Sequence, residues 1–585
     1  MGKIRSQVNP LDKSALIQMM NELGLLLELK GENPFKSRAY YNAARVLENL
    51  NEDLEVLIHE QRLCQIPGFG DALVKKINEW AQTGTIDDYE NLKASIPEGF
   101  LELLRIPGLG PKKINLIYQE LGIASIAQLK EACYNNQLAA LQGFGVKTQE
   151  KICAGIQFIE EHRNDFLSID ALPLAFDIRD HLAGRRPVQK IELAGSIRRF
   201  KEMVHDLDFV VASTDPAEVA NYFTALPVID KVTSSGSTKI SAILKSGIAA
   251  DLRIVKPEEF PHALQHFTGS KEHNTKLRHI AKELGYKVNE YGLFKNGGTQ
   301  ATYCLDENGI YQTVGLKYIP PELREDLGEL EAASAGTLPV LVKPEDIRGV
   351  FHVHTTYSDG RSTLREVVTE AVKEGFEYIG ITDHSQSAVY AHGLSWETIK
   401  KQWAEIDSLE QEFPQCRIFK GIEADILSSG ELDYGPEILT QFDFVIGSIH
   451  SNFRMSKTEM TNRLMKAMDN PYLTMLGHPT GRILGERPGY EVDLEALIQK
   501  AARGSIVLEF NANPYRLDLD WRWCRKAREL GVLIAVNPDA HNSQELKLAY
   551  SGIMVARKGW LTAADVLNTK SRREIETFIL KRKTK

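Results

Sequence analysis

The stretch FHVHTTYSDG, residues 351–360, places two histidines one residue apart at the end of an apolar run. Successive side chains of a β-strand point to opposite faces, so His352 and His354 share a face if the run is extended. Asp359 follows five residues after the second histidine. Alternate histidines on a strand are more often incidental than metal-binding, so the interpretation depends on partners elsewhere in the chain.

Later apolar runs of strand length supply such partners at their C-terminal ends. The runs YIGITDH, FKGIEADI, FVIGSIH, TMLGHPT and IAVNPDAH end with Asp383, His384, Glu423, His450, His478, Asp539 and His541. The run IVLEFNAN (506–513) predicts another strand, without an obvious ligand. Strands that alternate with helices and gather polar residues at these ends indicate a TIM-like barrel with its site on that face. Imidazoles and carboxylates together can hold a cluster of Zn²⁺, Mn²⁺ or Fe²⁺.

This region resembles the PHP (polymerase and histidinol phosphatase) family, whose fold is a distorted (β/α)7 barrel. The resemblance implies nine metal ligands: His352, His354, Asp359, His384, Glu423, His450, His478, Asp539 and His541. Asp383 is expected to support a ligand rather than bind metal. Arg482 and Arg516 lie just past strand ends, where they serve either as a phosphate clamp or as structural residues.

The middle of the chain carries a second carboxylate pattern, in IELAGSIRRFKEMVHDLDFVV (191–211). Asp206 and Asp208 open an apolar run and share one strand face, and Asp251 holds a similar position in IAADLRIV. Adjacent carboxylates repel each other, and a divalent cation relieves the repulsion. The pattern indicates a two-metal nucleotidyl transfer site, with solvated aspartates at a strand edge as the alternative.

The same stretch resembles the DNA polymerase X family, of which DNA polymerase beta is the familiar member. The resemblance implies that Asp206, Asp208 and Asp251 bind two Mg²⁺ (or Mn²⁺) and catalyse transfer from a dNTP, and that a polymerase-beta-like palm is followed by a thumb or fingers region. Its nucleotide-binding residues would be Gly195, Ser196, Arg199, His266, Phe267, Thr268, Gly269, Lys271, Asn274 and Arg278. His266 and Lys271 depart from the family pattern, which places sugar selectivity and nucleotide affinity in question.

Three similar segments begin at residues 66, 106 and 141, each with a Gly-apolar-Gly turn before an amphipathic helix. They resemble helix-hairpin-helix modules, which bind DNA backbones through exposed amides rather than basic side chains. That mode suits residues 1–163, which contain 18 Lys and Arg and 21 Asp and Glu, a net charge of −3. The turn glycines are Gly68, Gly70, Gly108, Gly110, Gly143 and Gly145. Purely structural hairpins remain the alternative.

The polymerase X resemblance also reaches this region. It aligns Lys76 with the Schiff-base lysine of a 5′-deoxyribose-phosphate lyase, and Lys36 with a residue that binds a 5′-phosphate. A solvated helix lysine is an equal alternative for Lys76, and the adjacent Lys75 is another candidate. A lyase lysine needs a lowered pKa to be nucleophilic at neutral pH.

Size and composition agree with several soluble domains. The chain has 585 residues, a net charge of −9, and six scattered cysteines without a CxxC pair. These features favour a protein of the reducing cytoplasm, without a disulfide framework and without a membrane span. When bound to DNA, the protein is expected to be associated with the nucleoid. We expect a lyase-like hairpin domain (1–85), further hairpins (86–165), a palm (166–260), a nucleotide- and template-binding subdomain (261–324), a linker (325–347) and a PHP domain (348–585).

Together these features resemble bacterial and archaeal family X polymerases. They predict a monomeric enzyme that fills short gaps in nicked or gapped DNA during repair, with PHP-dependent 3′→5′ exonuclease and AP endonuclease activities. Two alternatives are a small-molecule phosphatase of the histidinol-phosphate type with a vestigial polymerase half, and a non-catalytic DNA-bridging protein. The intact set of Ser196, Asp206, Asp208 and Asp251 argues against the first, and the complete PHP ligand set argues against the second.

Overall fold

The computed structural model describes residues 13–48, 50, 54–97, 99–104, 106, 109–161 and 165–583. The chain divides into two compact units, residues 1–163 and 164–585. None of the helices in the described part of the chain is long and apolar enough to cross a membrane.

The first unit is helical where it is described, and its amphipathic helices bury leucines and isoleucines in one shared core. Its helices are α1 (Lys13–Lys30), α2 (Pro34–Glu48), α3 (Leu54–His59), α4 (Asp71–Thr83), α5 (Asp87–Ala94), α6 (Phe100–Leu104), α7 (Pro111–Leu121), α8 (Ile126–Tyr134) and α9 (Val146–Glu161).

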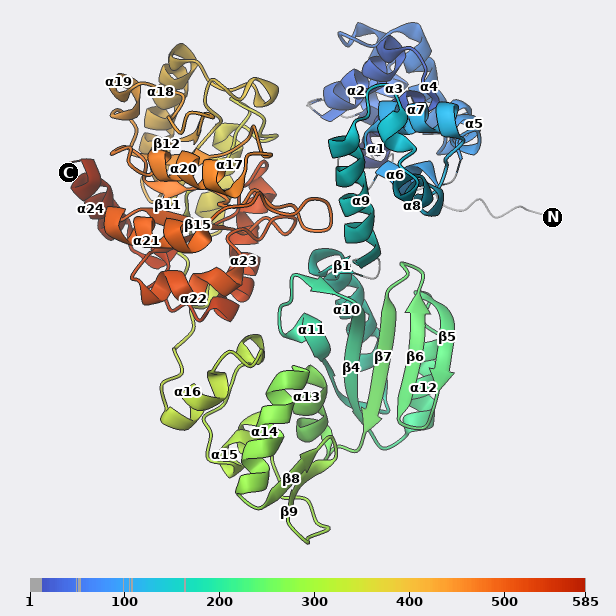
Figure 1. Ribbon diagram of the computed structural model, residues 1–585, viewed down its shortest axis with the longest axis vertical. Coiled ribbons are helices and arrows are strands. Elements are labelled where there is room, and N and C mark those ends of the chain that lie inside the picture. Colours follow the sequence, from blue (N-terminus) through green and yellow to red (C-terminus); the bar gives the residue numbers. More distant parts are fainter. Residues whose placement is uncertain are drawn as a thin grey trace. The chain divides into compact units, whose positions relative to one another are not determined.

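The second unit begins with a five-stranded mixed sheet in the order β2-β4-β7-β6-β5, and Figure 1 shows its last four strands side by side. Its strands are β2 (Val188–Leu193), β4 (Asp206–Ser213), β5 (Ile229–Ser235), β6 (Lys239–Leu244) and β7 (Ala249–Val255). A small ladder pairs β1 (Phe166–Leu167) with β3 (Met203–Val204). The accompanying helices are α10 (Ser168–Ala183), α11 (Gly195–Arg198) and α12 (Pro216–Thr224). Of all pairs in this sheet only β4 and β7 run parallel, which brings the first residues of both strands to one edge.

A helical subdomain follows the sheet. It contains α13 (Phe260–Thr268), α14 (Lys271–Glu283), the hairpin β8 (Tyr286–Asn289) and β9 (Gly292–Lys295), α15 (Glu307–Thr313) and α16 (Glu329–Ala335). Helix α16 lies in the segment 325–347, whose composition predicted a linker. Leu330 and Ala333, three residues apart, are both buried in the subdomain core, so this connection is folded.

Seven parallel strands form the C-terminal barrel, in sequence order from β10 to β16. They are β10 (Gly349–Val350), β11 (Tyr378–Ile381), β12 (Arg417–Asp425), β13 (Phe444–Ser448), β14 (Met475–Leu476), β15 (Val507–Asn511) and β16 (Ile534–Asn537). A parallel bridge between Val353 and Ala540 joins the last strand to the first. The predicted distorted (β/α)7 barrel is confirmed.

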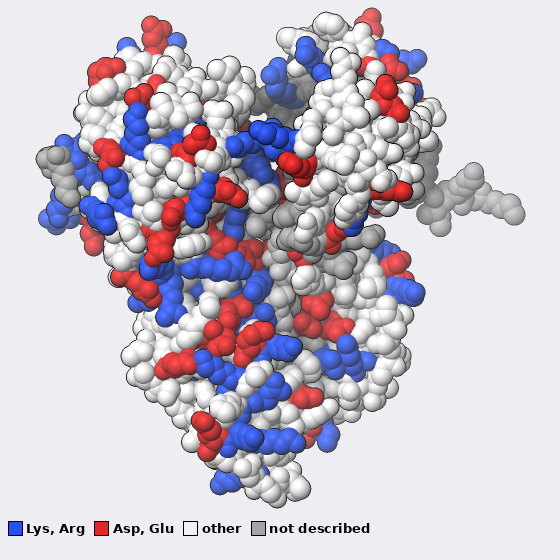
Figure 2. Space-filling model, viewed as in Figure 1, with Lys and Arg blue, Asp and Glu red and all other residues white. Residues whose placement is uncertain are grey.

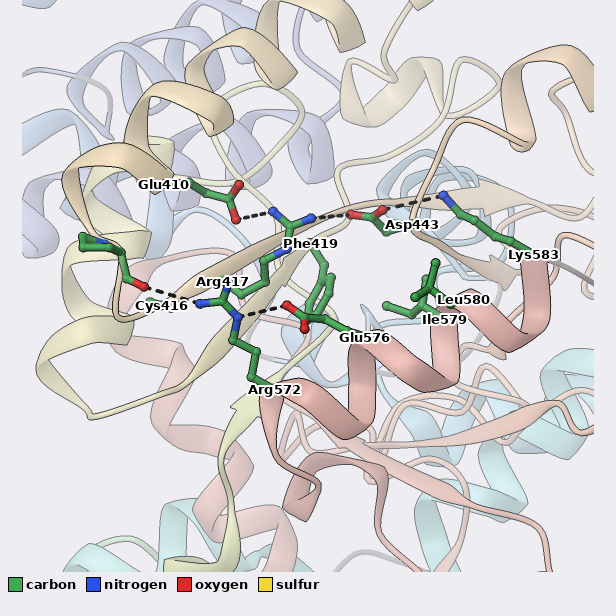
Figure 3. Close-up of a pocket in the computed structure, with 11 residues that line it drawn as sticks. Glu410, Cys416, Arg417, Phe419, Asp443, Arg572, Glu576, Ile579, Leu580 and Lys583 are labelled. Carbon is green, nitrogen blue, oxygen red and sulfur yellow. Dashed lines mark hydrogen bonds and ion pairs between the residues drawn. The ribbon is translucent and has the colours of Figure 1, made fainter.

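Helices surround the barrel: α17 (Leu364–Lys373), α18 (Trp396–Glu412), α19 (Pro436–Leu439), α20 (Lys457–Ala467), α21 (Leu494–Gly504), α22 (Trp521–Glu529), α23 (Leu548–Ala556) and α24 (Arg572–Lys583). Ile575 and Ile579 of α24 pack in one cluster with aromatic residues of the strands. A pocket of about 510 Å³ lies beside this helix, at the amino ends of β12 and β13. Figure 3 shows Arg417 between Glu410 and Asp443 there.

Candidate active sites

The three aspartates of the palm lie at one edge of its sheet. In the parallel register of β4 and β7, Asp208 is opposite Asp251 and Asp206 is opposite Ala249. All three are half-buried, while the residues between them are buried. Alternation along each strand therefore points the three carboxylates to the same face.

The electrostatics of this edge fit a divalent cation. Burial, and then the charges of Asp206 and Asp251, raise the pKa of Asp208 to about 7. Burial and the charge of Asp251 also raise the pKa of Asp206. Lys239 partly compensates, with its Nζ 2.7 Å from Asp251 Oδ2. Carboxylates that repel one another at an accessible edge are suitable ligands for Mg²⁺ or Mn²⁺.

Gly195 begins helix α11 directly against this site. Its φ is +62°, and a Cβ built there would lie 2.0 Å from Asp208 Oδ2. The Ala194 amide donates to the Asp208 carbonyl at 2.8 Å. A glycine is required here because any side chain would collide with the carboxylate.

Two arginines at the end of α11 have different partners. Arg198 forms a two-pronged ion pair with Glu307, at 3.0 and 2.6 Å. Arg199 donates from Nη1 to the Thr268 carbonyl, and its Nε lies 3.2 Å from Glu325 Oε1. The structure thus brings Arg199 to the predicted nucleotide segment but pairs it with protein groups. Ser196 is half-buried in the same turn.

The predicted nucleotide segment spans α13 and α14. Asn274 is buried, and its Nδ2 donates to the His266 carbonyl at 2.7 Å. Phe267 meets the His266 ring edge-on, at 5.0 Å between centroids. Arg278 donates to the Asn274 carbonyl at 3.2 Å, and Lys271 is exposed at the start of α14. In this arrangement Asn274 organises the segment from within.

The barrel gathers the predicted PHP ligands at the C-terminal ends of its strands. Three groups of side chains each converge closely enough for one metal ion: His354, Asp359, His384 and His541; His352, His354 and Asp539; His384, Glu423 and His450. His354 and His384 each belong to two groups, so the three positions adjoin. Eight of the nine predicted ligands are in these groups. The ninth, His478, lies beside them with its Nε2 3.0 Å from Glu423 Oε1.

Several buried ring nitrogens of this cluster accept or donate no hydrogen bond, which is the arrangement that a metal ligand needs. Neither ring nitrogen of His354 has a hydrogen-bond partner, and neither does Nε2 of His352. Burial and the neighbouring His541 and His384 rings lower the pKa of His354 to about 3, so its imidazole is neutral and able to bind metal. Burial opposes ionisation of Glu423, but the surrounding imidazoles hold its pKa well below the usual range. This donor set fits Zn²⁺, Mn²⁺ or Fe²⁺.

Strand β15, for which the sequence offered no metal ligand, carries residues that hydrogen-bond to the predicted ligands. Glu509 on β15 is fully buried and lies 2.7 Å from His352 Nδ1. Asn511, two residues later, donates to Asp539 Oδ2 at 2.9 Å. The signal for these residues was the alternation Glu-x-Asn in an otherwise apolar strand. Asp425 similarly lies 2.6 Å from His450 Nδ1.

The other barrel residues named from sequence have distinct places. Asp383 is fully buried and accepts hydrogen bonds from Thr355 and Gln402. Arg482 binds the Arg516 carbonyl at 2.9 Å and Asp520 at 2.6 Å, as a structural residue does. Arg516 lies at the site, with its Nε 3.6 Å from Asp539 Oδ2.

The hairpin turns of the first unit repeat one geometry. Gly68 and Gly143 have φ of +94° and +85°, and a Cβ at either would meet no neighbour. The carbonyls of Gly70, Gly110 and Gly145 each accept bonds from the amides three and four residues later. Gly108 lies outside the described residues. The open side of each described turn allows close backbone approach by a phosphate.

The two lysines expected at DNA ends are both in ion pairs. Lys36 is exposed and lies 3.2 Å from Glu32. Lys76 pairs with Asp88. Burial acts to lower the pKa of Lys76, but the hydrogen bond to Asp88 and the charges of Tyr40, Asp88 and Glu79 together outweigh it, and the pKa is raised. Lys76 is therefore protonated in this conformation. Figure 2 shows both signs of charge intermixed over the face in view.

Comparison with known proteins finds family models for the hairpin regions, the subdomain after the palm sheet and the barrel. Family models match at residues 12–86 (helix-hairpin-helix domain), 100–157 (SAM-like helix-hairpin-helix tandem), 263–325 (DNA polymerase beta thumb) and 351–513 (PHP domain). The DNA polymerase/3′-5′ exonuclease PolX of Bacillus subtilis (strain 168) is 40% identical over 569 residues, 97% of this chain and 99% of that protein. A probable phosphatase of Thermoanaerobacter sp. (strain X514) is 29% identical over 37% of this chain and 89% of its own length. One from Caldicellulosiruptor saccharolyticus is 32% identical over 32% of this chain and 78% of its own.

Proposed function

The chain belongs to the family X DNA polymerases that carry a PHP domain, and we propose that it fills short gaps during DNA repair. As a member of that family it is a DNA polymerase with 3′→5′ exonuclease activity. The observation that carries the proposal is the convergence of three aspartates beside the Gly195 turn, in a chain that matches a polymerase relative over nearly its whole length.

In the palm, Asp206, Asp208 and Asp251 would hold two Mg²⁺ or Mn²⁺ ions, which supply charge stabilisation for nucleotidyl transfer. Asp251 would also accept the proton of the primer 3′-hydroxyl. Ser196 and Arg199 would hold the triphosphate of the dNTP, beside Phe267 and Gly269 at the sugar.

The test is Asp208→Ala, with incorporation of a dNTP into gapped DNA as the measurement. We expect incorporation to be lost and 3′→5′ degradation to persist, because the barrel ligands are in a separate cluster. Asp230→Ala is the matched control, since that aspartate is exposed on β5 of the same sheet. Substantial incorporation by Asp208→Ala would refute the assignment of this site.

In the barrel, the eight clustered ligands and His478 would hold Zn²⁺, Mn²⁺ or Fe²⁺, which supply an activated hydroxide for phosphodiester hydrolysis. Glu509 and Asp425 would orient His352 and His450, and Arg516, beside Asp539, would contact a phosphate. We infer 3′ ends of DNA as the main substrate and abasic sites as a second one.

His354→Ala tests the barrel, because this side chain joins two of the three groups. We expect bound metal and 3′→5′ degradation to fall together while gap filling continues. His181→Ala, at an exposed histidine of α10, is the control. Full degradation by His354→Ala would place the exonuclease outside the barrel.

A phosphatase role accounts for less of the chain. The probable phosphatases match about a third of it, and the palm aspartates have no part in that reaction. We infer gapped DNA as the substrate, and a monomer that works in the cytoplasm with the nucleoid. The glycine turns and Lys36 would bind a 5′-phosphate in the gap, so incorporation should be faster on gaps that carry that phosphate than on gaps that lack it.

A further inference from the structure

A fully buried lysine of the C-terminal part reaches the polymerase site. Lys558 lies in the short 3₁₀ turn η7 (Arg557–Gly559) that follows α23, and its side chain has no exposed surface. Its Nζ donates to the Arg199 carbonyl at 2.8 Å and to Glu325 Oε1 at 2.8 Å. A buried ammonium is costly unless it is paired and hydrogen-bonded, so this contact is specific.

Glu325 is the point where three cations meet. Its carboxylate lies 2.8 Å from Lys558, 3.2 Å from Arg199 and 3.3 Å from Lys201, and its side chain is 10% exposed. Burial opposes its ionisation, but Lys558 and then the other two cations hold its pKa below the usual value. Glu325 is therefore an anion that Lys558 and Arg199 share.

Arg199 is held between Glu325 and the nucleotide segment. Its Nη1 donates to the Thr268 carbonyl, and a Cβ on Gly269 would lie 3.1 Å from the same nitrogen. The turn that ends at Arg199 begins at Gly195, against the Asp208 carboxylate. A displacement of Arg199 would therefore shift both the turn beside the Asp208 carboxylate and the predicted nucleotide segment.

The residues on either side of Lys558 also contact the polymerase part of the chain. Arg557 pairs with Glu322 and donates to the Val342 carbonyl at 2.7 Å. Trp560 packs in the core of the helical subdomain with Leu330. The turn at Lys558 is thus anchored on both sides by the polymerase part.

We propose that Lys558 is a positioning residue for the polymerase: it holds the Arg199 turn through the Arg199 carbonyl and shares the Glu325 carboxylate with the Arg199 guanidinium, so that Glu325 competes less strongly with the triphosphate for that guanidinium. This inference rests on the proposed role of Arg199. Without Lys558, Glu325 would have only Arg199 and Lys201 as partners and would bind the guanidinium more closely. Competition between a carboxylate and a triphosphate for one arginine weakens nucleotide binding.

The experiment compares Lys558→Met, Glu325→Gln and the double variant of the full chain, with steady-state gap filling as the assay. We expect Lys558→Met to raise KM for the dNTP about tenfold and to change kcat less than threefold. Adding Glu325→Gln to Lys558→Met should lower KM for the dNTP again by at least threefold, because it removes the competing carboxylate. Lys547→Met, at an exposed lysine just before α23, should leave both constants unchanged.

Further measurements distinguish a positioning role of Lys558 from a folding defect and from a failure of the proposed polymerase function. Bound metal and 3′→5′ degradation should match wild type in every variant. An unchanged KM in Lys558→Met would overturn the inference, and so would a double variant no better than Lys558→Met. If Lys558→Met does not fold, the double variant, which removes both buried charges, carries the test: a KM within threefold of wild type supports the inference, and one tenfold higher overturns it. A wild-type protein that incorporates no dNTP would instead refute the proposed function.

Discussion

Glu509 offers a direct test of how the barrel prepares its histidines, through the substitution Glu509→Gln. Each carboxylate oxygen faces two nitrogens: Oε1 lies 2.7 Å from His352 Nδ1 and 3.0 Å from Asn537 Nδ2, and Oε2 lies 2.7 Å from the His478 amide and 3.3 Å from Asn511 Nδ2. An ionised carboxylate only accepts hydrogen bonds, so it places the proton of His352 on Nδ1 and leaves Nε2 free for metal.

The expected effect of Glu509→Gln on metal affinity and on the nuclease rate follows from these hydrogen bonds. A glutamine must turn its NH₂ group toward one of the two pairs of donors, whichever rotamer it adopts. Each donor left without an acceptor costs about 1–3 kcal/mol, and loss of a support behind a metal ligand costs about 10- to 100-fold in metal affinity or activity. We therefore expect Glu509→Gln to lose metal about 10- to 100-fold more readily and to degrade DNA at least tenfold more slowly.

Metal per chain after dialysis and the rate of 3′→5′ degradation are the measurements. Glu329→Gln is the matched control, because Glu329 is also fully buried and lies 2.6 Å from a histidine nitrogen, His273 Nδ1. The control should lower Tm and leave bound metal unchanged. If Glu509→Gln keeps its full metal content and nuclease rate, Glu509 does not set the His352 tautomer and the reasoning fails.

Gly195→Ala should reduce dNTP incorporation at least about tenfold with nuclease activity intact, since the new Cβ would lie 2.0 Å from Asp208 Oδ2; normal incorporation would contradict the assigned geometry. Asp88→Asn should increase borohydride trapping on a 5′-deoxyribose-phosphate end at neutral pH, because Asp88 raises the pKa of Lys76, and equal trapping would show that Asp88 does not restrain that lysine. Burial opposes ionisation of Glu307, but its two arginine partners outweigh this and hold its pKa at about 2, below the usual 4.5. Its charge therefore stabilises the fold above pH 4.5, and that contribution, about 3 kcal/mol, is lost as the pH falls toward 2. The difference in free energy of unfolding between wild type and Glu307→Gln should shrink over this range in denaturant titrations, and a constant difference would contradict the linkage.

Residues with a regular period could be identified from the sequence. Asp206 and Asp208 share a strand face because they are two residues apart, and the register places Asp251 opposite Asp208. Most of the predicted PHP ligands follow an apolar run of strand length, which is why the sequence offered them as candidates. The parallel barrel then brings these strand ends together, and eight of the nine predicted ligands lie in three adjoining groups.

Other features depended on packing and had no local signal. The segment 325–347 looked like a linker because it is acidic and then rich in small residues, yet α16 forms there and buries Glu329, Leu330 and Ala333. Lys76 was a candidate nucleophile by alignment alone, and only the fold showed Asp88, twelve residues later, as its partner. A side chain's pKa depends on neighbours in space, which a linear pattern does not specify.

The amino-acid sequence by itself determined the fold class, with a barrel at the C-terminal end of the chain, and it supplied the candidate site residues, because hydrophobic period and side-chain type are local properties. Only the tertiary structure decided which groups orient those residues. Glu509 and His352 are 157 positions apart, and Lys558 and Arg199 are 359 positions apart. Contacts of that separation exist only after whole elements have packed, since burial brings a donor to one acceptor and excludes the water that would otherwise satisfy both.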